Sequence, residues 1–262
     1  MSAPHFVKSP QYKTGFVSII LPTYNEAGNI IALAEELDSH VKFPKEIIVV
    51  DDDSPDGTSR LVQECIAGGA IPGLRLETRT ADRGLRKSIE RGIEIAQGDI
   101  ICWMDCDFSH PPEDMALLVQ EVLNGADIVI ASRYMKGGVY KKGLGWFDAD
   151  ESAFAVLLSR IINWIIHVVL DPRIHDYTSG FVAFRRSVLE SLLPLRGDYG
   201  EYFVELIYCA VKTRNISIIE LPFTSPPRRS GQSKTGTTFR ALFWRGLPYA
   251  RLIPKLRAMK NN

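Results

Sequence analysis

The sequence predicts an α/β protein built on a doubly wound, mostly parallel sheet. Short apolar runs rich in Val and Ile recur through residues 16–132, and segments with helical periodicity separate them. Clusters of polar residues follow several of these runs, at the points where strands would end. Because the carboxyl ends of parallel strands meet at one edge of a sheet, we expect a ligand site along that edge.

Strands and helices alternate through the first half of the chain. Pro22 is placed to close the first strand, and Gly98 to end the third helix. The apolar runs predict strands at residues 16–21, 46–50, 74–78, 99–104 and 127–132. The periodic segments predict helices at residues 29–40, 58–67, 86–97 and 112–124.

A long apolar segment opens the second half. Residues 153–170 carry a narrow polar stripe at helical spacing, formed by Ser159, Arg160, Asn163 and His167. Such a helix would span ~27 Å at ~1.5 Å per residue, just short of a membrane crossing, and Arg160 makes spanning costly. We expect an interfacial or groove-lining helix, with a buried core helix as the alternative. A helix at 202–213 and a strand at 216–221 follow.

Composition narrows the class of protein. The 262 residues are 45% hydrophobic and 24% charged, which is typical of globular proteins, and zero net charge gives no indication of nucleic acid binding. Residues 221–262 nevertheless hold nine Lys or Arg and no Asp or Glu, which favours an anionic partner such as a membrane surface. Scattered cysteines predict a reducing compartment, and residues 1–14 lack the apolar core of a signal peptide.

The most informative motif is Asp105-Cys106-Asp107, which follows the apolar run 100–104. In a strand, residues i and i+2 point to the same side, so Asp105 and Asp107 can converge on one cation. Hard oxygen ligands suit Mg²⁺ or Mn²⁺, which takes its remaining ligands from water and phosphates. We therefore expect a divalent metal that bridges a diphosphate. For this motif alone, a solvated turn is the alternative.

Three further polar clusters are expected at the same edge. Tyr24 offers a stacking face and Glu26 an acceptor in Pro22-Thr23-Tyr24-Asn25-Glu26. A carboxylate of Asp51-Asp52-Asp53-Ser54-Pro55-Asp56-Gly57-Thr58 can accept from a base N–H or a ribose hydroxyl. Residues 228–234 form a cationic, glycine-containing loop able to hold phosphate. Each cluster alone has a structural explanation, but four at one edge favour a ligand site.

These motifs, with Ser132-Arg133-Tyr134, Thr178-Ser179-Gly180-Phe181 and Arg228-x-x-Gly231-x-Ser233-Lys234, resemble the polyprenyl-phosphate glycosyltransferases. This group, which includes the dolichol-phosphate mannose synthases, belongs to the inverting family-two glycosyltransferases. The resemblance covers about residues 17–236. It implies a GT-A-like fold, Mg²⁺ or Mn²⁺ as cofactor, and transfer of a hexose, mannose from GDP-mannose, to a polyprenyl or dolichyl phosphate.

The resemblance also implies roles for individual residues. The nucleotide sugar would be bound by Pro22, Tyr24, Glu26, Asp52, Asp105, Cys106, Asp107, Arg228 and Lys234, with the metal on Asp105 and Asp107. The acceptor phosphate would meet Arg133, Ser159 and Arg160. Catalysis would rest on Asp107, Arg133, Arg228 and Lys234. Glu205 matches an acidic position of the family to which no role is assigned.

The expected organisation is a flexible N-terminus (1–15), a catalytic domain (16–236) and a basic amphipathic tail (237–262). Pro248 and Pro254 are expected to break the tail helix into pieces, and its apolar residues, among them Leu252, Ile253 and Leu256, to contact a membrane. We expect a peripheral protein at the cytoplasmic face of a membrane, held there by the tail, with an integral anchor or partner subunit as a further possible partner.

Other functions fit parts of the pattern. Within the family, the donor could be UDP-glucose or UDP-GlcNAc, or the acceptor another lipid or a saccharide. The cations Arg86 and Lys87 stand where relatives carry small residues, and Ala155 stands where they carry Arg, which bears on the acceptor. An Asp-x-Asp phosphatase would place its motif after the first strand rather than about the fourth. A non-catalytic binding subunit would have no need of the intact charged motifs.

Overall fold

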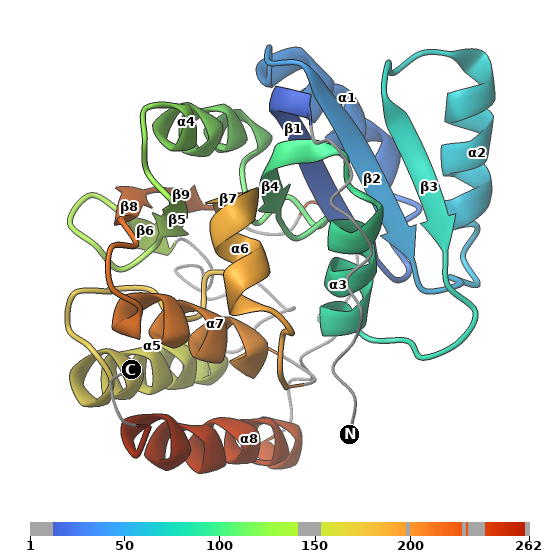
Figure 1. Cartoon of the computed structure of the whole chain (residues 1–262). Helices are drawn as coiled ribbons and strands as arrows, with labels where there is room; N and C mark the ends of the chain where they lie inside the picture. Colours follow the sequence, from blue (N-terminus) through green and yellow to red (C-terminus); the bar gives the residue numbers. More distant parts are fainter. Residues whose placement is uncertain (1–12, 141–152, 198–199, 227–228, 230–238, 260–262) are drawn as a thin grey trace, which may run out of the picture.

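A seven-stranded sheet forms the centre of the computed structural model, which describes residues 13–140, 153–197, 200–226, 229 and 239–259 (Figure 1). The strand order is β3-β2-β1-β4-β7-β5-β8, and every neighbouring pair is parallel except the two that β7 makes. The strands are β1 (Lys13–Thr23), β2 (Lys45–Asp51), β3 (Leu74–Thr78), β4 (Gly98–Trp103), β5 (Ile128–Ser132), β7 (Val182–Arg185) and β8 (Ile218–Pro222). The predicted doubly wound, mostly parallel sheet is confirmed.

The strand order contains a switch point beside β1. The chain adds β2 and β3 on one side of β1 and then places β4 on its other side. Connections that leave neighbouring strands in opposite directions open a crevice at their carboxyl ends, which is where open α/β sheets bind ligands. The loops after β1 and β4, which carry two of the predicted motifs, therefore lie at the place where a site is expected.

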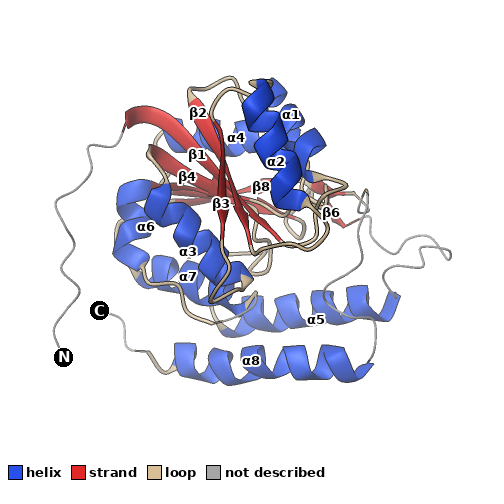
Figure 2. Cartoon of the chain, turned by 90° about the vertical axis from the view of Figure 1, so that its right-hand side faces the viewer, coloured by secondary structure: helices blue, strands red, loops and turns tan. Residues whose placement is uncertain are grey.

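Helices cover both faces of the sheet (Figure 2). One core cluster joins the sheet to α1 (Ile30–His40), α2 (Thr58–Gly68) and α4 (Pro112–Leu123). The opposite cluster joins it to α3 (Leu85–Ile95), α6 (Arg186–Leu192) and α7 (Glu201–Lys212). Strands such as β2, whose residues 46–51 are all buried, are apolar on both sides because both faces are covered. The sheet is thus rigid, and its edge loops are held from two sides.

Helix α6 escaped the sequence prediction, and so did two features of the strand pairing. The antiparallel strand β7 is only four residues long and runs between β4 and β5. A small parallel ladder joins β6 (Val139–Tyr140) to β9 (Thr224–Ser225). Both features depend on pairing between residues that are distant in the sequence, which local periodicity does not record.

Helix α5 (Ala153–Val169) forms close to its predicted bounds and turns Asn163 and His167 of its polar stripe toward the protein, while Arg160 of that stripe is exposed. Asn163 is buried, its amide nitrogen donates to the carbonyl of His175 (2.6 Å), and its amide oxygen accepts from the Tyr177 N–H (3.0 Å). The imidazole of His167 lies 2.7 Å from the carbonyl of Ile174. Large apolar side chains are exposed along the same helix at Leu157, Ile161, Trp164, Ile165 and Val168. The inward face of α5 thus combines these polar groups with Ile162 and Ile166, which pack on the core, while its outward face is largely apolar, unlike that of an ordinary surface helix.

Helix α8 (Phe239–Arg257) lies beside α5 in both views, and the Arg257 guanidinium donates to the Val169 carbonyl at the end of α5 (3.0 Å). The prediction that Pro248 and Pro254 break this helix was wrong, because α8 continues through both. Packing accounts for the difference. Leu256 is fully buried, and Leu252 and Ile253 rest on the core, so these three side chains contact the protein rather than a membrane. No helix within the described residues is long and apolar enough to cross a membrane.

Candidate active site

The loops after β1 and β2 are joined by main-chain donors and side-chain acceptors. The first loop donates three N–H groups to the second, namely Asn25 to Ser54 Oγ (2.9 Å), Glu26 to Thr58 Oγ1 (3.0 Å) and Ala27 to Asp56 Oδ2 (2.9 Å). Burial by itself raises the pKa of Asp56, but the bonds from Thr58 and Ala27 outweigh burial and lower it, so the carboxylate stays charged. Pro22, Tyr24 and Glu26 are thereby brought beside the second motif, and the ring of Tyr24 is 40% exposed.

The three consecutive carboxylates after β2 have different surroundings. Asp51 is fully buried and accepts bonds from Thr23, Ser54 and Ser59, so it holds the β1 and β2 exits together. Asp53 is exposed and forms an ion pair with Arg83. Of these three residues, Asp52 alone is buried and has a side chain that binds the loop after β3.

The Asp52 side chain joins the exit of β2 to the start of α3. Its Oδ1 accepts from Arg79 Nη1 (2.6 Å) and Ser88 Oγ (2.8 Å), and its Oδ2 accepts from the Gly84 N–H (2.6 Å). The sequence predicted that this carboxylate faces a base or ribose, which stays a prediction. Sequence reasoning missed Arg79, although its position directly after β3 is a strand-end signal.

The Asp105 and Asp107 carboxylates lie on a turn rather than on a strand. Strand β4 ends at Trp103, so the alternation expected of a strand does not set their direction. Asp105 is exposed, while the Asp107 side chain is largely buried and its Oδ1 accepts from the Ser109 N–H (2.9 Å). Phe108 adopts a left-handed φ of 64°, which is costly for a bulky residue and persists only where the surroundings hold it.

The side chain of His110 supports this turn from the protein interior. Its Nδ1 lies 3.0 Å from the Asp105 N–H and must accept that proton, so the neutral ring carries its own proton on Nε2. The ring is buried, stacks on Phe181 with 4.9 Å between centroids, and meets the edge of Phe223. The Thr178–Phe181 motif therefore supports the carboxylate turn. The sequence placed His110 after the motif without giving it a function.

The side chain of Cys106 faces inward. It is buried, and its Sγ lies 3.6 Å from the carbonyl oxygen of Pro22. The thiol thus links the exits of β4 and β1, and any contact of Cys106 with a nucleotide sugar is left to its main chain.

Arg133 is bound firmly by a residue that the sequence did not single out. Its Nε and Nη2 donate to Asp176 Oδ2 and Oδ1, each at 2.9 Å, and Nη2 also donates to Thr178 Oγ1 (3.0 Å). Burial raises the pKa of Asp176, but the Arg133 charge and its hydrogen bonds outweigh burial and lower it. Glu220 fixes the same loop by accepting from the Asp176 N–H (2.9 Å).

The predicted acceptor residues gather around Tyr134. Burial raises the pKa of its phenol, while the charge of Arg133, a hydrogen bond with Ser159 and the charge of Arg160 each lower it. These interactions bring α5, through Ser159 and Arg160, to the exit of β5. The structure therefore places Arg133, Ser159 and Arg160 in one region, and their binding of an acceptor phosphate stays a prediction.

Arg228 and Lys234 lie outside the described residues, but Arg229 between them is described. Its N–H donates to the carbonyl oxygen of Asp107 (3.1 Å), and its guanidinium lies over the Phe108 ring, 3.8 Å from the centroid. Its Nη1 also pairs with Glu36 Oε1 (2.9 Å). The predicted cationic segment is thus attached to the carboxylate turn.

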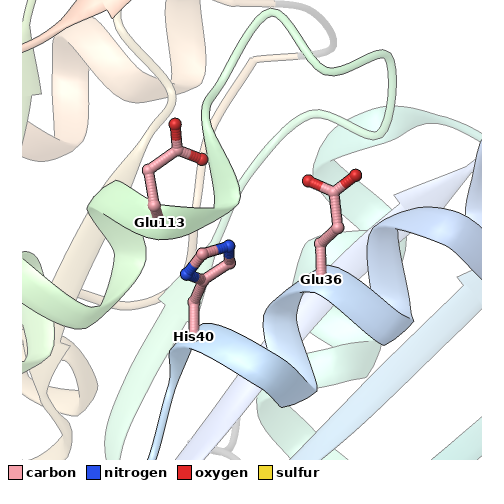
Figure 3. Close-up of side chains that lie close together, drawn as sticks. All are labelled: Glu36, His40 and Glu113. Carbon is pink, nitrogen blue, oxygen red and sulfur yellow. The ribbon is translucent and has the colours of Figure 1, made fainter.

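Two further sets of residues that include glutamates lie elsewhere in the protein. Glu205, to which no role was assigned, is buried on α7 and pairs with Arg196 (3.0 Å). Glu36, His40 and Glu113 form the one group of three His, Cys, Asp or Glu residues, among those described, that lies close enough to share a cation (Figure 3). Because Arg229 already pairs with Glu36, we interpret this group as the seat of a guanidinium rather than of a catalytic metal.

The carboxylate turn fits a hard divalent cation. Asp105 and Asp107 offer carboxylate oxygens at the switch point, and of the described residues beside them the Cys106 thiol faces Pro22 and His110 Nδ1 accepts from the main chain. Such a donor set suits Mg²⁺ or Mn²⁺, which complete their shells with diphosphate oxygens and water.

Comparisons with known proteins agree with this geometry. The family model "Glycosyl transferase family 2" matches residues 18–193. A dolichol-phosphate mannosyltransferase of Pyrococcus furiosus is 37% identical over 223 residues, which is 83% of this chain and 58% of that protein. A polyprenol monophosphomannose synthase of Mycolicibacterium smegmatis is 34% identical over 222 residues, 82% of this chain and 79% of that protein. The chain thus spans somewhat more than half the length of the Pyrococcus relative.

Solved structures show the same fold. Glucosyl-3-phosphoglycerate synthase of Mycobacterium tuberculosis, in complex with Mn²⁺, UDP and glucosyl-3-phosphoglycerate, matches with a TM-score of 0.65 and 19% identity over 94% of this chain and 81% of that one. Its complex with Mg²⁺ and UDP gives a TM-score of 0.61 at 20% identity, over 92% and 78% of the two chains. The GT-A-like fold expected from the sequence is confirmed, and the chain belongs to glycosyltransferase family 2.

Proposed function

We propose that this chain is an inverting glycosyltransferase that moves a hexose, mannose from GDP-mannose, to a polyprenyl or dolichyl phosphate. Two relatives that are 34–37% identical over most of the chain are named for mannose transfer to such lipids. The single observation that carries the proposal is the position of Asp105 and Asp107, at the switch point of the sheet and on the same edge as the Arg133 region.

The donor would lie across the exits of β1, β2 and β4. Tyr24 offers an exposed ring for a base, and Asp52 and Arg79 form the wall beside it. Asp105 and Asp107 would hold Mg²⁺ or Mn²⁺, which supplies positive charge to the diphosphate when bound. Arg228 and Lys234 would add cations as the leaving nucleotide gains negative charge.

The acceptor phosphate would lie near Tyr134. Ser159 supplies a hydroxyl and Arg160 a cation there. Arg133, largely neutralised by Asp176, holds the wall of this region as well as contributing N–H donors. A phosphate monoester is ionised near neutral pH and is already nucleophilic, so the chain needs no general base. Attack on the face opposite the leaving group inverts the anomeric carbon.

The lipid would approach from the side of α5. The outward face of this helix exposes Leu157, Ile161, Trp164, Ile165 and Val168, with Trp164 63% exposed. Its inward face carries Ser159 to the acceptor region, and the neighbouring α8 exposes Arg251 and Lys255. An apolar face with Trp, flanked by basic side chains, is suited to the headgroup level of an anionic membrane. We propose that the protein binds peripherally there, at the cytoplasmic face.

A screen of donors against acceptors tests this function. The purified chain would be incubated with GDP-mannose, UDP-glucose or UDP-GlcNAc and with polyprenyl phosphate, a neutral lipid or a saccharide, and products identified by mass. We expect hexosyl polyprenyl phosphate to form from GDP-mannose, with dependence on Mg²⁺ or Mn²⁺. Efficient transfer to the neutral lipid or the saccharide, with none to polyprenyl phosphate, would refute the proposed acceptor.

A further inference from the structure

We propose that Arg229 and Glu36 form a latch that positions the Asp107 turn for its cation, a role that deepens the proposed function and rests on it. Three contacts converge on Arg229. Its N–H binds the Asp107 carbonyl, its guanidinium covers the Phe108 ring, and its Nη1 pairs with Glu36 of α1. Glu36 thus connects a helix of the rigid core to the loop that carries the carboxylates.

The turn needs such support. Phe108 has a left-handed φ of 64°, a conformation that a large side chain adopts at a cost. The Phe108 side chain is buried on one side and covered by the guanidinium of Arg229 on the other. Since Asp107 directly precedes Phe108, loss of this cover would allow the turn to relax and move the Asp107 carboxylate.

Glu36 neutralises the positive charge of Arg229 near the turn. A cation beside a metal site repels a metal ion unless a carboxylate neutralises it. Glu36 supplies that carboxylate at 2.9 Å, with His40 and Glu113 close by (Figure 3). Removing Glu36 would leave the guanidinium that covers Phe108, the residue after Asp107, without this carboxylate partner.

Arg229 is joined to the turn by its main chain as well as by its side chain, because its own amide donates to the Asp107 carbonyl while its guanidinium covers the Phe108 ring. Arg229 is accordingly a positioning residue rather than a catalytic one.

Binding of Mn²⁺, followed by electron paramagnetic resonance with and without GDP, tests the latch independently of turnover. We expect Arg229→Ala to weaken Mn²⁺ binding about tenfold, the scale of one exposed ion pair and one cation–π contact together. Arg229→Lys should recover part of this loss, because it keeps the charge but not the planar stack. Glu36→Gln should weaken binding about threefold, and the double variant no more than Arg229→Ala alone.

The control is Arg60→Ala, which breaks a more exposed ion pair, Arg60 with Glu64, on α2. Equal thermal midpoints of Arg229→Ala and Arg60→Ala would show that the fold is intact. Unchanged Mn²⁺ binding in Arg229→Ala, an equal loss in Arg60→Ala, or a wild-type chain that binds no Mn²⁺ would overturn the latch. A wild-type chain that binds Mn²⁺ with the expected dependence on Arg229, yet transfers no hexose, would refute the proposed function and leave the latch standing.

Discussion

Arg133 and Asp176 form a two-pronged ion pair in which Nε and Nη2 each lie 2.9 Å from a carboxylate oxygen. The Asp176 side chain is fully buried and that of Arg133 nearly so. The pair joins the exit of β5 to the loop before β7. The Thr178 hydroxyl accepts a further hydrogen bond from Arg133 Nη2. The region proposed for the acceptor phosphate is therefore built around an internal ion pair.

Asp176→Asn should destabilise the protein by about 3 kcal/mol, because it leaves the charge of Arg133 without its buried partner. The free energy of unfolding, measured in urea at pH 7, checks this. The control Asp171→Asn removes an ion pair with the exposed Arg173 and should cost about 0.5 kcal/mol. Equal costs for the two variants would contradict the structural role given to Asp176.

The same pair predicts a dependence of stability on pH. Because Arg133 lowers the pKa of Asp176 below its ordinary value of 3.8, the folded state binds the proton less readily than the unfolded state does. Its contribution to stability is complete above that ordinary value and is lost as the pH falls through the lowered one. The wild-type protein should lose stability below about pH 4 more steeply than Asp176→Asn does. Parallel pH profiles would argue against this pKa shift.

Asp107→Asn should reduce the rate of transfer more than ~100-fold, the scale of losing one strong electrostatic stabiliser. The measurement is hexose transfer from GDP-mannose in saturating Mn²⁺. Asp53→Asn is the matched control, since Asp53 is an exposed carboxylate at a neighbouring strand exit that pairs with Arg83. If Asp107→Asn keeps turnover close to that of the wild type, the metal does not depend on this carboxylate.

Trp164→Ser should weaken binding to anionic liposomes several-fold, because it removes the largest exposed apolar side chain of α5. Cosedimentation with vesicles that contain phosphatidylserine, at low and at raised salt, measures this binding. Leu117→Ser is the control, since Leu117 is 57% exposed on α4, across the sheet from α5. Equal binding of all three proteins would show that α5 does not face the membrane.

The sequence predicted the regular part of this fold because each strand and helix there has its own periodicity. The runs at 46–50 and 127–132 are buried on both faces, and buried strands of this kind are Val- and Ile-rich. β7 was missed because four residues carry no period of their own. The proline rule failed in α8 because packing of Leu256 and its neighbours on the core outweighs the hydrogen bonds lost at Pro248 and Pro254.

In the candidate site, too, features visible in the local sequence were predicted and features that depend on distant partners were missed. Asp105 and Asp107 were found because charges at the end of an apolar run are visible in a linear sequence. Asp176, Arg79 and His110 were missed because their functions come from partners far along the chain or across a turn, such as Arg133, Asp52 and Phe181. The direction of α5 was also hidden, because a polar stripe alone does not say whether it faces solvent or protein.

In the proposed reaction, a lipid phosphate rather than a lipid hydroxyl attacks the donor sugar. The most direct measurement compares polyprenyl phosphate with the polyprenol of identical chain length as acceptors for GDP-mannose, with products identified by mass and anomeric configuration. We expect a mannosyl phosphodiester of inverted configuration from the phosphate, no product from the alcohol, and loss of the product in Asp107→Asn. Transfer to the alcohol at a comparable rate, or a product of retained configuration, would contradict it.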